Sequence, residues 1–264
     1  MKRLSLILLF MSFHSFAYRL NTSNSAAFGS SKIYFYVTSN STCTNAGIDA
    51  NELLDLAEEA ADNFWNTVAT SSVRLQSGGL YETSDSLFQT GILCPEQSGS
   101  SCNTATSIPY VSKLLIACNS ETTSNFPSDD YIAIGAPTRL AGTRIRGSVI
   151  LINDTATSPF AGLSRSEKIS VLAHELGHAI GLGHSNKSEA LMYYQNPETI
   201  SALSQDDIDG VTYLYPNEAE DCSGIIGSIT DAEPPRFLFQ FLLSAGLFIA
   251  FWNRKRIIQK LSIR

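Results

Sequence analysis

The sequence predicts a folded domain that combines helices with β-strands and lies between two apolar end segments. Apolar residues make up 44% of the 264 residues and charged residues 16%, which excludes a disordered chain. A strand-like run near the start is followed by a long amphipathic helix, and a second helix comes late, after further β-rich runs. The length suffices for one sizeable core or two small ones.

The first 17 residues are typical of a signal peptide. Lys2 and Arg3 precede the apolar run 4–13, and residues 15–17 place small side chains at the −3 and −1 positions of a cleavage site. A buried N-terminal helix is the alternative, which the shortness of the run disfavours. We therefore expect an exported chain whose mature form begins near Tyr18.

A second apolar run covers residues 237–252, is interrupted by Gln240 and precedes a basic cluster. Sixteen helical residues span about 24 Å, short of the ~30 Å hydrocarbon core of a bilayer unless the flanking Arg236 and Trp252 extend the span. We expect a linker over 219–235, a transmembrane helix over 236–253 and a basic cytoplasmic tail over 254–264. A buried core helix and a cleaved sorting tail are the alternatives.

The charge pattern favours the same layout. The end segments carry eight basic and no acidic residues, so the net charge of −7 leaves −15 for residues 18–235. Such an acidic body repels phosphate backbones, which excludes nucleic acid as a partner. The expected location is the extracytoplasmic side of a membrane, or outside the cell if the tail is removed. The oligomeric state is not predicted.

The elements of the body follow in order from their patterns. Residues 32–39 alternate apolar and polar side chains, which predicts a strand. Residues 49–69 have an apolar stripe of helical period and a first turn rich in carboxylates, which predicts an amphipathic helix. Residues 72–76 are the next candidate strand.

The middle of the chain is expected to be an insertion over about 77–128, mostly loop, with a candidate strand at 114–117. Beyond it, the β-rich runs 131–134 and 148–152 are separated by the glycine- and arginine-containing residues 136–147.

All five cysteines lie in the exported part, where disulfides are permitted. They are Cys43, Cys94, Cys102, Cys118 and Cys222. The clustering of the middle three favours one bridge among them, and the full pairing stays open. No CxxC spacing occurs, so a cysteine zinc site is not expected.

The most informative stretch is HELGHAIGLGH at residues 174–184. His174 and His178 are four residues apart on a predicted helix, so both imidazoles face one side and suit one Zn²⁺. Glu175 lies about 100° round the helix, beside the metal, where it can reach the attacking water. Gly181 allows the chain to turn back and bring His184 in as third ligand, which leaves the fourth position open for catalysis.

This motif, followed by ALMY at residues 190–193, resembles the metzincin zinc proteases and, within them, the matrixins. The resemblance is close over 164–216 and concerns only the order of elements over 32–154. It implies an α+β domain over 18–218, with a twisted mixed sheet, a long helix, a zinc-binding helix and a horizontal cleft. It also implies that Met192 forms the methionine turn beneath the histidines.

Two further expectations come from comparison with that family. Matrixins usually have proline where this chain has Tyr194, whereas the related astacins and serralysins have a tyrosine there that approaches the zinc. Tyr194 is therefore a candidate catalytic residue, with packing in the cleft wall as the alternative. The mature chain has no fourth histidine, so we expect one catalytic zinc; calcium is possible in such a domain, but no pattern identifies its site.

The expected function is a zinc endopeptidase that hydrolyses extracellular or periplasmic proteins and peptides. Glu175 acts as general base and the membrane is a second partner through the C-terminal helix. The alternatives are a non-catalytic, zinc-stabilised, membrane-anchored interaction module and an adhesion ectodomain that works through the cysteine-bearing insertion. An intact Glu175 argues against the former, because a structural zinc site does not need that carboxylate.

Overall fold

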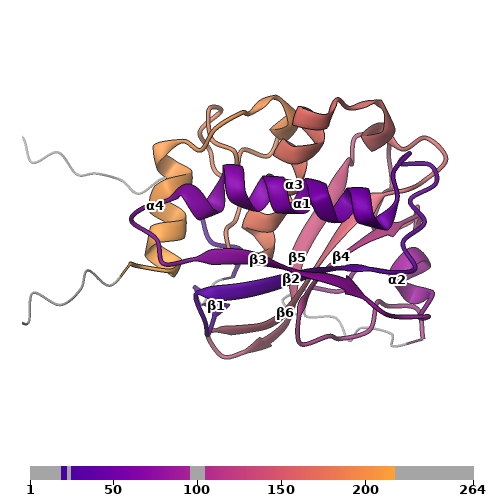
Figure 1. The fold of residues 1–264 in the computed structure, drawn as a ribbon, viewed down its shortest axis with the longest axis horizontal. Coiled ribbons are helices and arrows are strands. Elements are labelled where there is room, and N and C mark those ends of the chain that lie inside the picture. Colours follow the sequence, from indigo (N-terminus) through magenta and orange to yellow (C-terminus); the bar gives the residue numbers. More distant parts are fainter. Residues whose placement is uncertain (1–18, 23–24, 96–104, 218–264) are drawn as a thin grey trace, which may run out of the picture. The chain divides into compact units, whose positions relative to one another are not determined.

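A computed structural model describes residues 19–22, 25–95 and 105–217 (Figure 1). The strands are β1 (Ala27–Phe28), β2 (Lys32–Thr38), β3 (Arg74–Tyr81), β4 (Leu114–Asn119), β5 (Ala133–Ala141) and β6 (Arg144–Asn153). The helices are α1 (Ala50–Asn63), α2 (Leu87–Thr90), α3 (Arg165–Ala179) and α4 (Gln205–Leu214). Short 3-10 helices are η1 (Trp65–Thr67), η3 (Pro159–Gly162) and η4 (Pro197–Thr199).

The strands form one mixed sheet in the order β1-β6-β4-β2-β3, and β5 pairs with β6. All pairings are parallel except that of β5 with β6. Among the described strands, β5 pairs with β6 alone, so its other edge has no strand partner. The backbone N–H and C=O groups of an edge strand are available to bind an extended peptide.

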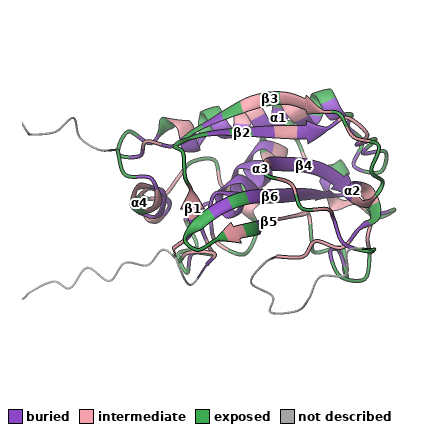
Figure 2. Ribbon diagram, turned by 90° about the horizontal axis from the view of Figure 1, so that it is seen from below, coloured by how far each residue is buried: buried purple, intermediate pink, exposed green. Residues whose placement is uncertain are grey.

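The helices α1 and α3 cover one face of this sheet (Figures 1 and 2). The Asp49 carboxylate caps α1 by accepting hydrogen bonds from the backbone N–H groups of Asn51 and Glu52. The α-helix is shorter than the expected 49–69 because η1 continues it after Phe64. The indole Nε1 of Trp65 donates to the carbonyl of Ala173, 2.7 Å away, and thereby ties the end of α1 to α3.

The sheet has an apolar core on each face, and β4 contributes to both. Leu114 and Ile116 belong to the main core under α1 and α3, whereas Leu115 and Ala117 belong to a smaller one, as strand alternation requires. Phe88 completes the smaller core together with other residues of the segment between β3 and β5. The predicted insertion is therefore partly structured, since it begins within β3 and carries α2 and β4.

The hairpin of β5 and β6 differs from the sequence expectation. Two short runs were expected with residues 136–147 between them, but both strands extend into that stretch and pair around the turn at 142–143. Arg144 and Arg146 are exposed while Ile145 is buried, so the strand alternation is present. The two arginines obscured this alternation in the sequence, because they lower the apolar content of residues 144–146 without changing the two-residue period of a strand.

One disulfide joins Cys43 to Cys118, which are 75 residues apart in sequence. Cys94 is also disulfide-bonded. The expected bridge among the middle cysteines therefore does not include Cys118, whose side chain faces the main core beside Cys43. Spacing along the chain could not reveal this pairing, because the sheet brings the two residues together.

The expected fold class is wrong in one respect, the C-terminal transmembrane helix. No helix in the described part of the chain is long and apolar enough to cross a membrane. The expected span at 236–253 and the signal peptide at 1–17 lie outside the described residues. The fold class that the structure supports is a mixed sheet with helices.

Candidate active site

Helix α3 carries the motif and is almost entirely buried. A capping box begins the helix: the Ser164 hydroxyl accepts from the backbone N–H of Glu167, and the Glu167 carboxylate accepts from the backbone N–H of Ser164. The helix then runs between α1 and β5, and every residue from Ile169 to Ala179 is buried. Its side chains are therefore held in place by packing on several sides.

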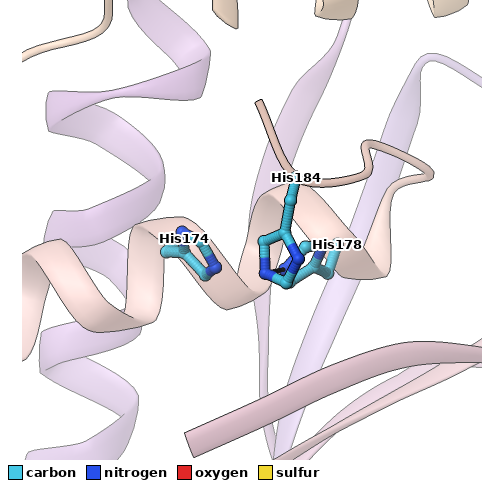
Figure 3. A group of neighbouring side chains, drawn as sticks. All are labelled: His174, His178 and His184. Carbon is cyan, nitrogen blue, oxygen red and sulfur yellow. Dashed lines mark hydrogen bonds between the residues drawn. The ribbon is translucent and has the colours of Figure 1, made fainter. Parts of the chain in front are cut away.

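His174, His178 and His184 come together at one point (Figure 3). One ring nitrogen of each histidine lies within 4.8 Å of the corresponding nitrogens of the other two, and the Nε2 atoms of His178 and His184 are 3.1 Å apart. Tetrahedral zinc ligands at 2.0–2.1 Å from the metal are about 3.3 Å from each other. The separations thus match three ligands of a single zinc ion.

Backbone carbonyls orient two of the imidazoles. The Nδ1 of His174 lies 2.6 Å from the Leu191 carbonyl oxygen, and the Nδ1 of His178 lies 2.9 Å from that of Leu182. A carbonyl only accepts, so Nδ1 carries the proton in both rings and Nε2 presents a lone pair. Lone pairs that converge at this distance repel each other unless a cation lies between them, which fits a metal site.

Burial keeps these imidazoles neutral. It lowers the pKa of His174 to about 4 and the pKa of His178 well below its usual value. A neutral imidazole is the form that binds a metal.

Glu175 points to the cleft from the same helix and is itself buried. Its Oε2 has no hydrogen-bond partner among the described residues, and burial raises the pKa of its carboxyl group to about 8. Gly135 of β5 packs directly against it: a Cβ on this glycine would lie 2.9 Å from Glu175 Oε2 and 2.8 Å from the Glu175 carbonyl oxygen. The close approach of β5 to α3 thus depends on a missing side chain, which sequence reasoning did not detect.

The chain reverses direction after α3. Gly181 adopts φ +117°, and its N–H donates to the carbonyl of His178. The reversal brings His184 back over the helix, and the next residue, Ser185, donates its N–H to the carbonyl of Met192 at 2.7 Å. Met192 is buried beneath α3, with its sulfur against Gly177.

Two aspartates of α4 hold this turn, a role the sequence did not disclose. The buried Asp207 carboxylate accepts from the backbone N–H groups of Leu191 and Met192, at 2.8 and 3.0 Å. Asp206 accepts from the Ser185 hydroxyl at 2.6 Å. Because the Leu191 carbonyl orients His174, α4 positions the histidine site from outside it.

A cleft of about 920 Å³ opens beside these residues. Its lining comes from residues 128–135, from α3 and from residues 194–198. Tyr194 is 58% exposed, lines the cleft and has its ring centre 6.4 Å from that of His184. The edge strand, the three histidines, Glu175 and Tyr194 therefore face one cavity.

A sequence model of the matrixin family matches residues 61–216, more than half of the chain. The chain belongs to the matrixin family. This is the family that the histidine motif indicated, and its members are zinc-dependent endopeptidases. The mixed sheet with its helices fits the catalytic domain of that family.

Individual relatives of this matrixin match over shorter stretches. Stromelysin-1 of Mus musculus is 57% identical over 49 residues, which are 17% of this chain and 10% of the relative. Metalloendoproteinase 1 of Glycine max is 42% identical over 64 residues, which are 24% of this chain and 20% of the relative. Matrix metalloproteinase-27 of Tupaia belangeri is 51% identical over 51 residues, which are 17% of this chain and 9% of the relative. The matched stretches span a fifth or less of these relatives.

Proposed function

We propose that this protein is a zinc endopeptidase that hydrolyses peptide bonds in the cleft beside α3. The observation that carries the proposal is the convergence of His174, His178 and His184 next to Glu175, in a cavity bordered by the edge of β5 that pairs with no described strand. A purely structural zinc site needs neither the cavity nor the carboxylate. The interaction-module alternative therefore leaves both unexplained.

The three histidines are the proposed zinc ligands. Zinc bound there supplies Lewis acidity, which polarises the scissile carbonyl and lowers the pKa of water. Glu175 takes a proton from the attacking water and delivers it to the leaving amine nitrogen. The raised pKa of its carboxyl group favours holding that proton between the two transfers, and a nearby cation counteracts the shift.

The proposed substrate is an extended peptide that adds to the free edge of β5. Main-chain hydrogen bonds to the first part of this strand, next to Gly135, would place the scissile carbonyl beside the histidines. We also propose that the Tyr194 hydroxyl donates a hydrogen bond to the oxyanion that forms on that carbonyl, and the position of its ring beside His184 supports this role. We propose an extracytoplasmic location, on the basis of the signal-peptide pattern and the Cys43–Cys118 disulfide.

The Glu175→Ala variant tests the general base. It should retain one zinc per chain but hydrolyse peptides at least ~10²-fold more slowly, because it removes a proton carrier and no ligand. His184→Ala is the matched comparison and should lose zinc as well as activity. Zinc content by metal analysis and peptide turnover are measured together. Unchanged turnover in Glu175→Ala would overturn the mechanism.

A further inference from the structure

Glu198 lies in the wall of the cleft, on the short helix η4. This helix packs along α3, and the Ser170 hydroxyl of α3 donates to the carbonyl of Ile200 at 2.7 Å, which holds the segment in place. Val171 lines the same cleft and lies three residues before His174, on the same face of α3. Glu198 therefore borders the same cleft as the histidine site, from a segment that is hydrogen-bonded to α3 four residues before His174.

The side chain of a substrate residue next to the scissile bond would reach this part of the cleft. Successive Cα atoms of an extended peptide are 3.8 Å apart, and a long side chain extends further than that. With the scissile carbonyl at the histidines, a long neighbouring side chain would therefore extend along the cleft that Glu198 also lines.

The charges of the cleft are of one sign. Its lining contains the carboxylates of Asp130, Glu175 and Glu198 and no lysine or arginine. The Oε2 atom of Glu198 is buried and has no hydrogen-bond partner in the described part of the chain. In the described part of the chain, Arg165 forms an ion pair with Glu59. Both side chains are exposed and lie outside the cleft lining, so this pair does not neutralise the charge of the cleft. A carboxylate with an oxygen that lacks a donor is costly, and a cationic group in the cleft that Glu198 lines can pair with this carboxylate through a charge-assisted hydrogen bond.

We propose that Glu198 makes this protein selective for substrates that carry a lysine or arginine next to the scissile bond. The ammonium or guanidinium group of that residue would donate to the Glu198 carboxylate, and Asp130 is a further carboxylate in the cleft lining. This inference rests on the proposed endopeptidase function and specifies its substrate class.

The first test uses the zinc-loaded wild-type protein and a peptide series that differs only in the residues flanking the scissile bond. Arginine is compared with citrulline, its neutral isostere, and lysine with norleucine. We expect kcat/KM to favour the charged member of each pair by at least ~10-fold at one flanking position. Equal rates within both pairs at both positions would overturn the inference and leave the endopeptidase function standing. If none of the peptides is cleaved, the endopeptidase function fails, and the inference with it.

The second test assigns the preference to one carboxylate. The Glu198→Gln variant keeps the shape of the side chain and removes its charge, so the arginine-to-citrulline ratio should fall to within ~2-fold of unity. Glu189→Gln is the matched control, because Glu189 is exposed and does not line the cleft. It should keep the wild-type ratio. A wild-type ratio in Glu198→Gln would contradict the assignment.

Discussion

Tyr194 lines the cleft beside His184. Removing its hydroxyl tests whether it stabilises the oxyanion or only packs in the cleft wall. If it donates to the oxyanion, Tyr194→Phe removes one hydrogen bond made in the transition state. We expect kcat to fall ~10²-fold with KM and zinc content unchanged. Tyr34→Phe, at an exposed tyrosine outside the cleft lining, is the control and should stay within a few-fold of wild type. A wild-type kcat for Tyr194→Phe would return this residue to a packing role.

The site also depends on one glycine, Gly135. A Cβ there would come within 3 Å of two Glu175 oxygens, so Gly135→Ala must displace either β5 or the carboxylate. We expect zinc to remain bound while kcat/KM falls at least ~10-fold, since misplacement of a catalytic group by ~1 Å can cost ~10²-fold.

Gly162→Ala is the matched control for that prediction. No atom lies within 4 Å of the position its Cβ would take, and the residue is exposed. Its turnover should equal that of the wild type. If Gly135→Ala is equally active, then the contact between β5 and Glu175 is not needed for catalysis.

At the scale of elements, α4 supports a site to which it contributes no ligand. Asp207→Ala leaves the buried N–H groups of Leu191 and Met192 without their acceptor. We expect the free energy of unfolding to fall by about 2–3 kcal/mol, because buried donors without partners each cost about 1–3 kcal/mol. Urea denaturation of the zinc-bound protein measures this change.

The same variant should also bind zinc more weakly, since the Leu191 carbonyl orients His174. Asp209→Ala is its control on the same helix. Asp209 is exposed and accepts a hydrogen bond from Gln205 at the surface, so its loss should change stability by less than about 0.5 kcal/mol. Equal stability of the two variants would show that α4 does not brace the turn.

At the scale of the whole molecule, the disulfide Cys43–Cys118 closes a long loop of the chain. Replacing both cysteines by alanine should destabilise the domain by about 4 kcal/mol in the chain-entropy account and lower Tm by on the order of 10 °C. Calorimetry measures the shift. Neither cysteine lines the cleft, so peptide turnover at 25 °C should stay near that of the wild type. An unchanged Tm would contradict the stabilising role.

Much of the candidate site could be predicted because it is local in sequence. His174, Glu175 and His178 lie on one helix, whose regular geometry converts their spacing into a shared position. The backbone freedom of glycine likewise made the reversal at Gly181 predictable, and with it the return of His184. Periodicity also located α1 and β2, since each buries one stripe or one face against the core.

The remaining features depend on contacts between segments far apart in the chain. The pairing of Cys43 with Cys118, the approach of Gly135 to Glu175 and the bracing of Met192 by Asp207 each join different elements. The position of Glu198 in the cleft likewise follows from the packing of η4 on α3. Residue type and spacing carry no information about such contacts, because they arise only when the sheet and helices pack together. Local backbone geometry therefore determined the chemistry of this site, and tertiary packing decided which residues support it and which line its cleft.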